Sequence, residues 1–271
     1  MTGSLDGVSA KIKRAEENIN QLNAEIESFL RDNQTPYTVV GQLQPNATEY
    51  IFTVRGELNV PVRFSVLAGE VVHQLRSSLD HLAHSLVVQH IRSEPAWNTA
   101  FPIGINKKEY KKACERRLKQ SVSSTAADLI LSVQPYIVSK VPEESTLWTL
   151  HQMNNRDKHR LLLVSAGGIG LVHEVTIDTH APPPIGSQYS GPVIDSIFPQ
   201  EEPSPVTKDG IELMRIILGE PYPGFQAYGK TTAQIIVEVP NKPGTYRPLI
   251  PLLTQMLKLT RRIVGSFKNE F

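Results

Sequence analysis

One stretch of the sequence, residues 61–91, is unusually rich in side chains that can transfer protons or bind phosphate. At about 100° per residue, a helix over this stretch has a leucine stripe on one side and a polar group on the other. The polar group comprises His73, Arg76, Ser77, Asp80, His81 and His84. Imidazoles, a guanidinium and a carboxylate on one face indicate either a reactive or anion-binding site or an ordinary solvated face.

A second polar group interrupts the apolar pattern of a helix expected over residues 143–165. Its apolar arc includes Leu147, Leu150, Leu161 and Leu162, and the polar residues His151, Asn154 and Lys158 fall within the same arc. Burying such groups without partners costs on the order of 1–3 kcal/mol each, and more for the lysine. We therefore expect partners on a neighbouring helix, or a ligand. The candidate contacts here are His151, Asn154, Asn155, Asp157, Lys158, His159 and Arg160.

The same side chains also suggest a metal site inside a helical bundle. His73, Asp80 and His84 are spaced by seven and four residues, and His151 adds a fourth ligand if the two helices face each other. However, His73 and Asp80 are two turns apart, about 10 Å along the axis. Only Asp80 and His84 form a tight pair. A metal-binding bundle is thus one alternative, and no metal ligand is assigned.

Four short motifs together resemble a family of uncharacterised bacterial and phage-associated proteins. They are residues 73–82 (HQLRSSLDHL), 101–103 (FPI), 134–136 (QPY) and 157–160 (DKHR), in this order over about 90 residues. The resemblance implies no established activity.

Arg76 followed five residues later by His81 resembles the R-x4-6-H motif of the HEPN superfamily of helical bundles. This resemblance implies a metal-independent endoribonuclease of the toxin or phage-defence type, or an inactive relative, without a cofactor. It implies that His81 assists attack of a ribose 2′-hydroxyl and that Arg76 stabilises charge on the phosphate, with Asp80 as a supporting residue. A homodimer and an antitoxin or defence partner are expected with it. Ser77 departs from the larger polar residue that is common at this position.

A non-enzymatic alternative accounts for the basic groups equally well. A binding or regulatory module would recognise RNA or a nucleotide-like anionic ligand through Arg76, Lys158 and Arg160. The basic stretch 107–119 would add contacts to phosphates. No nucleophile-elbow, phosphate-loop or dinucleotide glycine motif is present, so these enzyme classes are not expected.

Several helices are expected to position these groups. Residues 9–31 carry apolar side chains at alternating steps of three and four, as in a helix packed along a seam. Further helices are expected over 61–91, 107–119, from Ser124 toward Tyr136, over 143–165 and from Pro248 to the end. Gly167 and Gly168 are expected to close the helix over 143–165.

Strands are expected in two regions of the sequence. A hairpin is expected from Tyr37–Leu43 and Thr48–Val54, and further strands over Leu171–Asp178, Val193–Phe198 and Thr232–Val239. Residues 181–206 are expected to be an irregular excursion. The fold class is therefore α+β: four or five helices in a HEPN-like bundle, with one sheet beside it. We expect a single unit, with residues 1–170 and 246–271 plus the hairpin 37–55 in the bundle and 171–245 as a β-rich appendage.

The amino-acid composition bears on nucleic-acid binding, disulfide formation and membrane association. The 28 Lys and Arg residues nearly balance the 27 Asp and Glu residues, so nucleic-acid binding requires a local basic patch. A single cysteine, Cys114, excludes an internal disulfide framework. No signal-like segment or apolar run of about 20 residues is present. We expect a cytoplasmic protein without a membrane partner.

Overall fold

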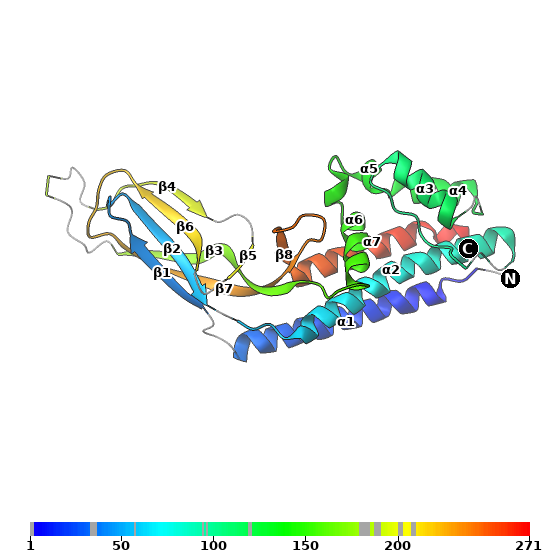
Figure 1. The fold of residues 1–271 in the computed structure, drawn as a ribbon, viewed down its shortest axis with the longest axis horizontal. Coiled ribbons are helices and arrows are strands. Elements are labelled where there is room, and N and C mark those ends of the chain that lie inside the picture. Colours follow the sequence, from blue (N-terminus) through cyan, green and yellow to red (C-terminus); the bar gives the residue numbers. More distant parts are fainter. Residues whose placement is uncertain are drawn as a thin grey trace.

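The computed structural model has an elongated shape, with helices at one end and strands at the other (Figure 1). It describes residues 3–32, 37–56, 58–93, 95, 97–118, 121–178, 185–186, 191–199, 203–206 and 210–271. Lys119, at the end of the basic stretch, and the prolines 182–184 of the expected excursion lie outside these residues. The mixed α+β class expected from the sequence is confirmed.

The helical end is built on long helices that lie along one another (Figure 1). The helices are α1 (Asp6–Asp32), α2 (Val62–Ile91), α3 (Lys107–Arg117), α4 (Ser124–Ser132), α5 (Pro135–Val138), α6 (Thr146–Asp157) and α7 (Leu249–Ser266), with 3-10 turns at Pro142–Glu144 and Lys268–Glu270. The seam expected in α1 is confirmed, since Ile12, Ala15 and Leu22 are buried against the main core. Polar contacts join the helices at their edges: Asn18 of α1 donates to Glu70 of α2 at 3.1 Å.

The helix expected over 143–165 is shorter than predicted. α6 ends at Asp157, Lys158 is its C-terminal cap, and strand β3 begins at Val164. Between them Leu162 is buried while Leu161 and Leu163 are exposed, which is the alternation of an extended chain. A short leucine run fits the periodicity of a helix as well as that of a strand. The sequence pattern therefore predicted a helix where the chain is extended.

Gly167 does not close a helix, as was expected, but lies inside β3 opposite Gln234. A Cβ atom at this position would lie 2.4 Å from Cδ1 of Ile236. The glycine is therefore required by the close approach of the side chain of Ile236.

The strands form two four-stranded antiparallel sheets, not the single sheet that was expected. One sheet has the order β1-β2-β6-β4 and the other the order β5-β3-β7-β8. The strands are β1 (Tyr37–Leu43), β2 (Glu49–Gly56), β3 (Val164–Asp178), β4 (Ile194–Pro199), β5 (Ser204–Pro205), β6 (Ile211–Leu218), β7 (Gln226–Glu238) and β8 (Tyr246–Pro248). β6 was not expected from the sequence; it lies between β2 and β4 and carries the buried residues Leu213 and Ile216.

Two hydrophobic cores correspond to the two ends of the molecule. The larger core joins the helices and includes Ile235 and Val237 of β7. The smaller core lies in the strand-rich end, where Phe52 of the early hairpin packs with Ile216. Ala227, at the other end of β7, belongs to this smaller core. The long strand β7 therefore connects the two cores.

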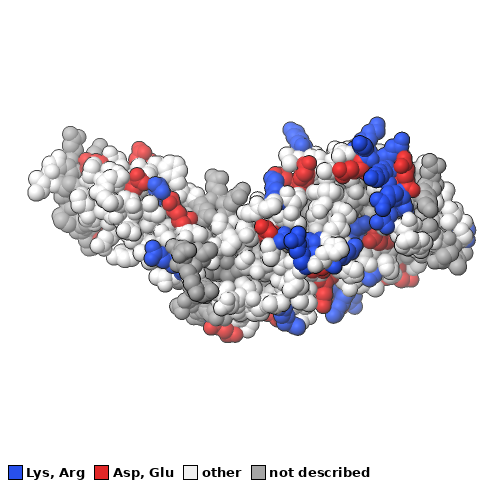
Figure 2. Space-filling view, in the orientation of Figure 1, with Lys and Arg blue, Asp and Glu red and all other residues white. Residues whose placement is uncertain are grey.

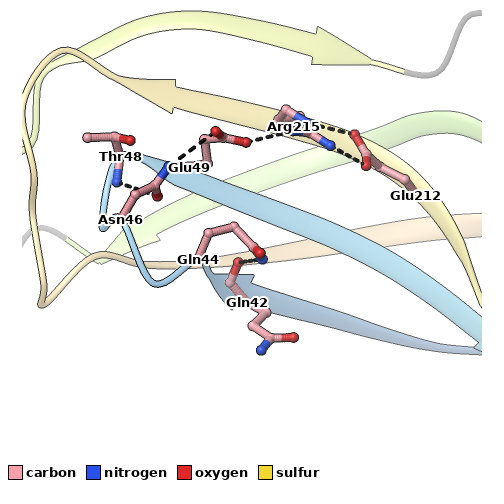
Figure 3. Close-up of polar contacts among 7 residues, drawn as sticks. All are labelled: Gln42, Gln44, Asn46, Thr48, Glu49, Glu212 and Arg215. Carbon is pink, nitrogen blue, oxygen red and sulfur yellow. Dashed lines mark hydrogen bonds and ion pairs between the residues drawn. The ribbon is translucent and has the colours of Figure 1, made fainter.

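The turn between β1 and β2 is held by polar contacts that Figure 3 shows. Asn46 accepts a hydrogen bond from the backbone N–H of Thr48 at 3.1 Å and donates one to Glu49 at 3.2 Å. Arg215 of β6 then joins Glu49 at 2.6 Å and Glu212 at 2.8 Å. These contacts tie the hairpin to the next strand of its sheet.

The same turn places Ala47 in the left-handed region, with φ at 54°. The backbone of Ala47 is held in this conformation, because its carbonyl accepts a hydrogen bond from the backbone N–H of Tyr222 at 2.8 Å. A Cβ atom is strained there, so Ala47→Gly should raise the free energy of unfolding by about 0.5–1 kcal/mol. Urea denaturation measures this change. The matched variant Ala10→Gly, on the exposed side of α1, should instead lower stability by about 1 kcal/mol. Equal losses in both variants would show that the turn is not strained.

Within the part of the chain that the structure describes, no helix is both long and apolar enough to cross a membrane.

Candidate ligand-binding site

The leucine stripe expected on α2 is confirmed, but the opposite face is not uniformly solvated. Leu75, Leu79 and Leu82 are fully buried. On the polar side His73, His81 and His84 are exposed, whereas the side chain of Arg76 is only 10% exposed. Arg76 therefore has a different environment from the histidines that accompany it in the sequence.

Arg76 and Asp80 together hold the backbone of Phe101. Nη2 of Arg76 donates to the carbonyl of Phe101 at 2.7 Å, and Oδ1 of Asp80 accepts from the N–H of the same residue at 2.9 Å. The two side chains also form an ion pair at 2.9 Å, one helical turn apart. Burial lowers the pKa of Arg76, while the carboxylate of Asp80 acts in the opposite direction and favours the charged guanidinium.

Gln134 fixes the same loop from the other side. Its fully buried amide donates to the carbonyl of Pro102 at 3.0 Å and accepts from the N–H of Gly104 at 3.1 Å. A Cβ atom at Gly104 would lie 2.4 Å from the backbone nitrogen of Tyr110, so only glycine allows this approach of α3. Three of the sequence motifs, 73–82, 101–103 and 134–136, thus meet at one buried loop, residues 101–104.

This loop forms one wall of a pocket with a volume of about 280 Å³, whose other walls are α3 and α6. Its lining residues are Arg76, Phe101, Pro102, Ile103, Glu109, Lys112, Ala113, Arg116, Arg117, Trp148 and His151. We call this cavity the Arg76 pocket.

The Arg76 pocket is strongly cationic. Four of its lining residues are Lys or Arg and one, Glu109, is acidic. Lys112, Arg116 and Arg117 come from the basic helix α3, which adds their charge to that of the buried Arg76. Figure 2 shows Lys and Arg side chains gathered over α3 and around the end of α6. Such a field favours an anionic occupant.

His151 enters the pocket from α6 as a neutral side chain. Burial, together with the charges of Arg76, Lys158 and Arg117, lowers its pKa to about 4. The amide nitrogen of Asn155 lies 3.1 Å from its Nε2 atom. Since an amide nitrogen can only donate, Nε2 accepts this bond and the neutral ring carries its proton on Nδ1. Nδ1–H of His151 is therefore a hydrogen-bond donor.

Two donors at this pocket have no acceptor among the residues that the structure describes. They are Nη1 of Arg76 and Nδ1 of His151, both buried. A buried donor without an acceptor costs about 1–3 kcal/mol, and more when it is charged. Neither atom is open to the pocket itself. An anion in the Arg76 pocket would instead meet the positive charge of Lys112, Arg116 and Arg117 and of the nearby Arg76. The arrangement is suited to binding a phosphate or carboxylate group.

The structure does not bring His81 to this pocket within one chain. His81 follows Arg76 by about 140° around the helix axis. It faces α1, where a Cβ atom at Gly7 would lie 3.1 Å from its Nδ1 atom. Partial burial and the nearby Lys11 lower the pKa of His81. His84 is exposed one turn further along α2.

The remaining predicted residues divide between the interior and the surface. Asn154 is buried, and the carboxylate of Asp157 packs where Gly69 of α2 leaves room for it, since a Cβ atom there would lie 2.2 Å from Oδ1. Burial raises the pKa of Asp157, and the nearby His73 opposes this. Lys158 was expected within the buried arc but is exposed, because α6 ends before it; His159 and Arg160 are exposed as well.

No metal site is found among the described residues, where no three His, Cys, Asp or Glu side chains are grouped to hold an ion. Asp80, the central ligand of the metal alternative, is instead engaged by Arg76 and by the backbone of Phe101.

The aromatic side chain of Trp148, which lines the pocket, was not expected from the sequence to belong to the site. Trp148 precedes His151 by three residues, so both lie on the same face of α6. This spacing of three residues could have predicted that Trp148 lies in the same site as His151. The loop 101–104 was noted only as part of a motif, and nothing in its sequence revealed that it contacts α2.

Comparison with protein-family models, with curated proteins and with solved structures gives no match to this chain.

Proposed function

We propose that the protein binds a small phosphate-bearing anionic ligand in the Arg76 pocket and acts as a binding or regulatory module. The observation that carries the proposal is that four cationic residues, Arg76, Lys112, Arg116 and Arg117, line one pocket that has a single acidic residue, Glu109. Guanidinium and ammonium groups gathered around one pocket are suited to the oxygens of a phosphate group. Asp80 and Gln134 support the site by fixing the loop 101–104.

The test is calorimetric titration of the protein with inorganic phosphate and pyrophosphate at about 0.15 M ionic strength, where exposed charges are screened beyond about 8 Å. The variant Lys112→Glu/Arg116→Glu changes two exposed cations that line the pocket. It should weaken binding at least tenfold, since it places two carboxylates beside the ligand.

The matched control for this test is Lys107→Glu/Lys108→Glu, which makes the same change of charge on α3 outside the pocket lining. It should leave affinity within about twofold, because screening reduces its effect at this ionic strength. Equal losses in both double variants would mean that the helix attracts anions without a defined site. No binding in the wild type would reject the proposal.

As a second candidate we keep metal-independent ribonuclease activity, and one observation favours it. A histidine and an arginine are needed at the same phosphate, and His151 lines the same pocket as Arg76 within one chain. RNA cleavage by the purified protein in excess EDTA tests it. Loss of cleavage in His151→Ala but not in His81→Ala would assign the chemistry to the pocket. Loss in His81→Ala would favour a site completed by a second chain. The homodimer, the antitoxin or defence partner and the cytoplasmic location stay predictions.

A further inference from the structure

From the composition of the Arg76 pocket we infer that its ligand is a nucleoside phosphate whose base stacks on Trp148; this rests on the proposed function. A bare anion would need only the cationic part of the lining. The pocket has a second, apolar part formed by Pro102, Ala113 and Trp148. A ligand with both a phosphate and a flat ring would contact both parts.

Trp148 is held in a position suited to stacking. It lies in the first turn of α6, where its backbone N–H donates to the capping hydroxyl of Ser145 at 3.3 Å. Its indole is half-buried against the main core, and the ring of His151 lies at a centroid distance of 5.4 Å with an angle of 39° between the planes. The indole is therefore fixed from one side, while the residue lines the pocket.

The distribution of charge in the pocket determines the orientation in which the ligand binds. The cations that line the pocket, three of them on α3, define the side on which the phosphate lies. Trp148 lines the same pocket from α6, so a base joined to that phosphate through a ribose reaches the indole. The volume of about 280 Å³ lies near the lower limit of small-molecule sites, which are roughly 300–1,000 Å³. This size suits a single nucleotide, either free or at the end of a strand.

The chain offers a direct readout, because it contains two tryptophans and the other, Trp97, is 97% exposed. In a Trp97→Phe background, Trp148 is the only tryptophan. Adenosine and uridine 5′-monophosphates should quench its fluorescence, because a base in van der Waals contact with the indole perturbs its excited state. They should bind about tenfold more tightly than ribose 5-phosphate, which lacks the ring.

In the same background, Trp148→Ala leaves no tryptophan, so binding is measured by calorimetric titration. This variant should lose the preference for nucleotides over ribose 5-phosphate but retain binding of inorganic phosphate. Trp148→Phe keeps a ring and should retain part of the preference. A 5′-phosphorylated oligonucleotide, compared with the free monophosphates, identifies the source: tighter binding of the oligonucleotide indicates the end of a strand, and equal binding indicates a free nucleotide.

These measurements distinguish a failure of this inference from a failure of the proposed function. If inorganic phosphate binds but nucleotides and ribose 5-phosphate bind equally, the base does not stack on Trp148 and this inference is overturned while the proposed function stands. If neither phosphate nor any nucleotide binds, both are overturned.

Discussion

Replacing Asp80 by alanine should lower the free energy of unfolding by about 3 kcal/mol, because the buried Arg76 then loses its carboxylate partner. The variant also leaves the N–H of Phe101 without its acceptor. Of the side-chain hydrogen bonds described above for the loop 101–104, those from Gln134 and one from Arg76 would remain. Urea denaturation followed by circular dichroism measures the loss.

Two further variants help to identify the cause of the stability loss in Asp80→Ala. Asp80→Asn keeps an acceptor for the N–H of Phe101 but removes the negative charge, so it should lose less stability than the alanine variant. Glu17→Ala breaks an exposed ion pair with Arg14 at 3.4 Å and should change stability by less than about 0.5 kcal/mol. A loss in Asp80→Ala no larger than that of Glu17→Ala would show that Arg76 does not depend on its carboxylate.

Acidification should destabilise the protein through His151. The pKa of this residue is about 4 in the folded chain, against an ordinary value of 6.5. The unfolded chain therefore takes up the proton first as pH falls. Above pH 6.5, the lowered pKa of His151 costs no stability, because the ring is neutral in both states. The free energy of unfolding decreases as pH falls from 6.5 toward 4. The total loss is on the order of 3 kcal/mol, at about 1.4 kcal/mol per pH unit of difference.

The measurement compares the free energy of unfolding of the wild type and His151→Gln across this range of pH. Glutamine does not titrate, so the difference between the two proteins should change by about 3 kcal/mol over that interval. All other ionisable groups are common to both chains. Parallel curves would show that His151 titrates normally. Saturating phosphate should reduce the acid sensitivity of the wild type, because an anion beside the imidazole favours its charged form.

The candidate site was partly visible in the sequence. Arg76 and Asp80 were singled out because they share a helix face with several histidines, and His151 was singled out because a polar residue inside an apolar arc requires a partner. The sequence could not separate Arg76 from His81 on the same helix. Their separation depends on which side of α2 contacts the loop 101–104 and which contacts α1, and this is a property of the packing.

The strand-rich end shows a similar limit. The hairpin was predicted from two β-rich runs joined by Pro45-Asn46, because these signals are local. β6 was missed because Glu212 and Arg215 interrupt its apolar residues, and because the apolar and polar residues do not alternate strictly along it. The division into two sheets follows from pairings between residues far apart in the chain, such as Phe52 with Met214.

The sequence by itself determined the long helices, the hairpin, the α+β class and the helices that carry the candidate chemistry, because these depend on local periodicity and turn residues. Only the tertiary structure decided that Arg76 and Asp80 hold the backbone of Phe101 and that Trp148 and His151 complete one cationic pocket. These contacts join residues 21 to 75 positions apart, and no local pattern specifies which polar side chains will be buried together.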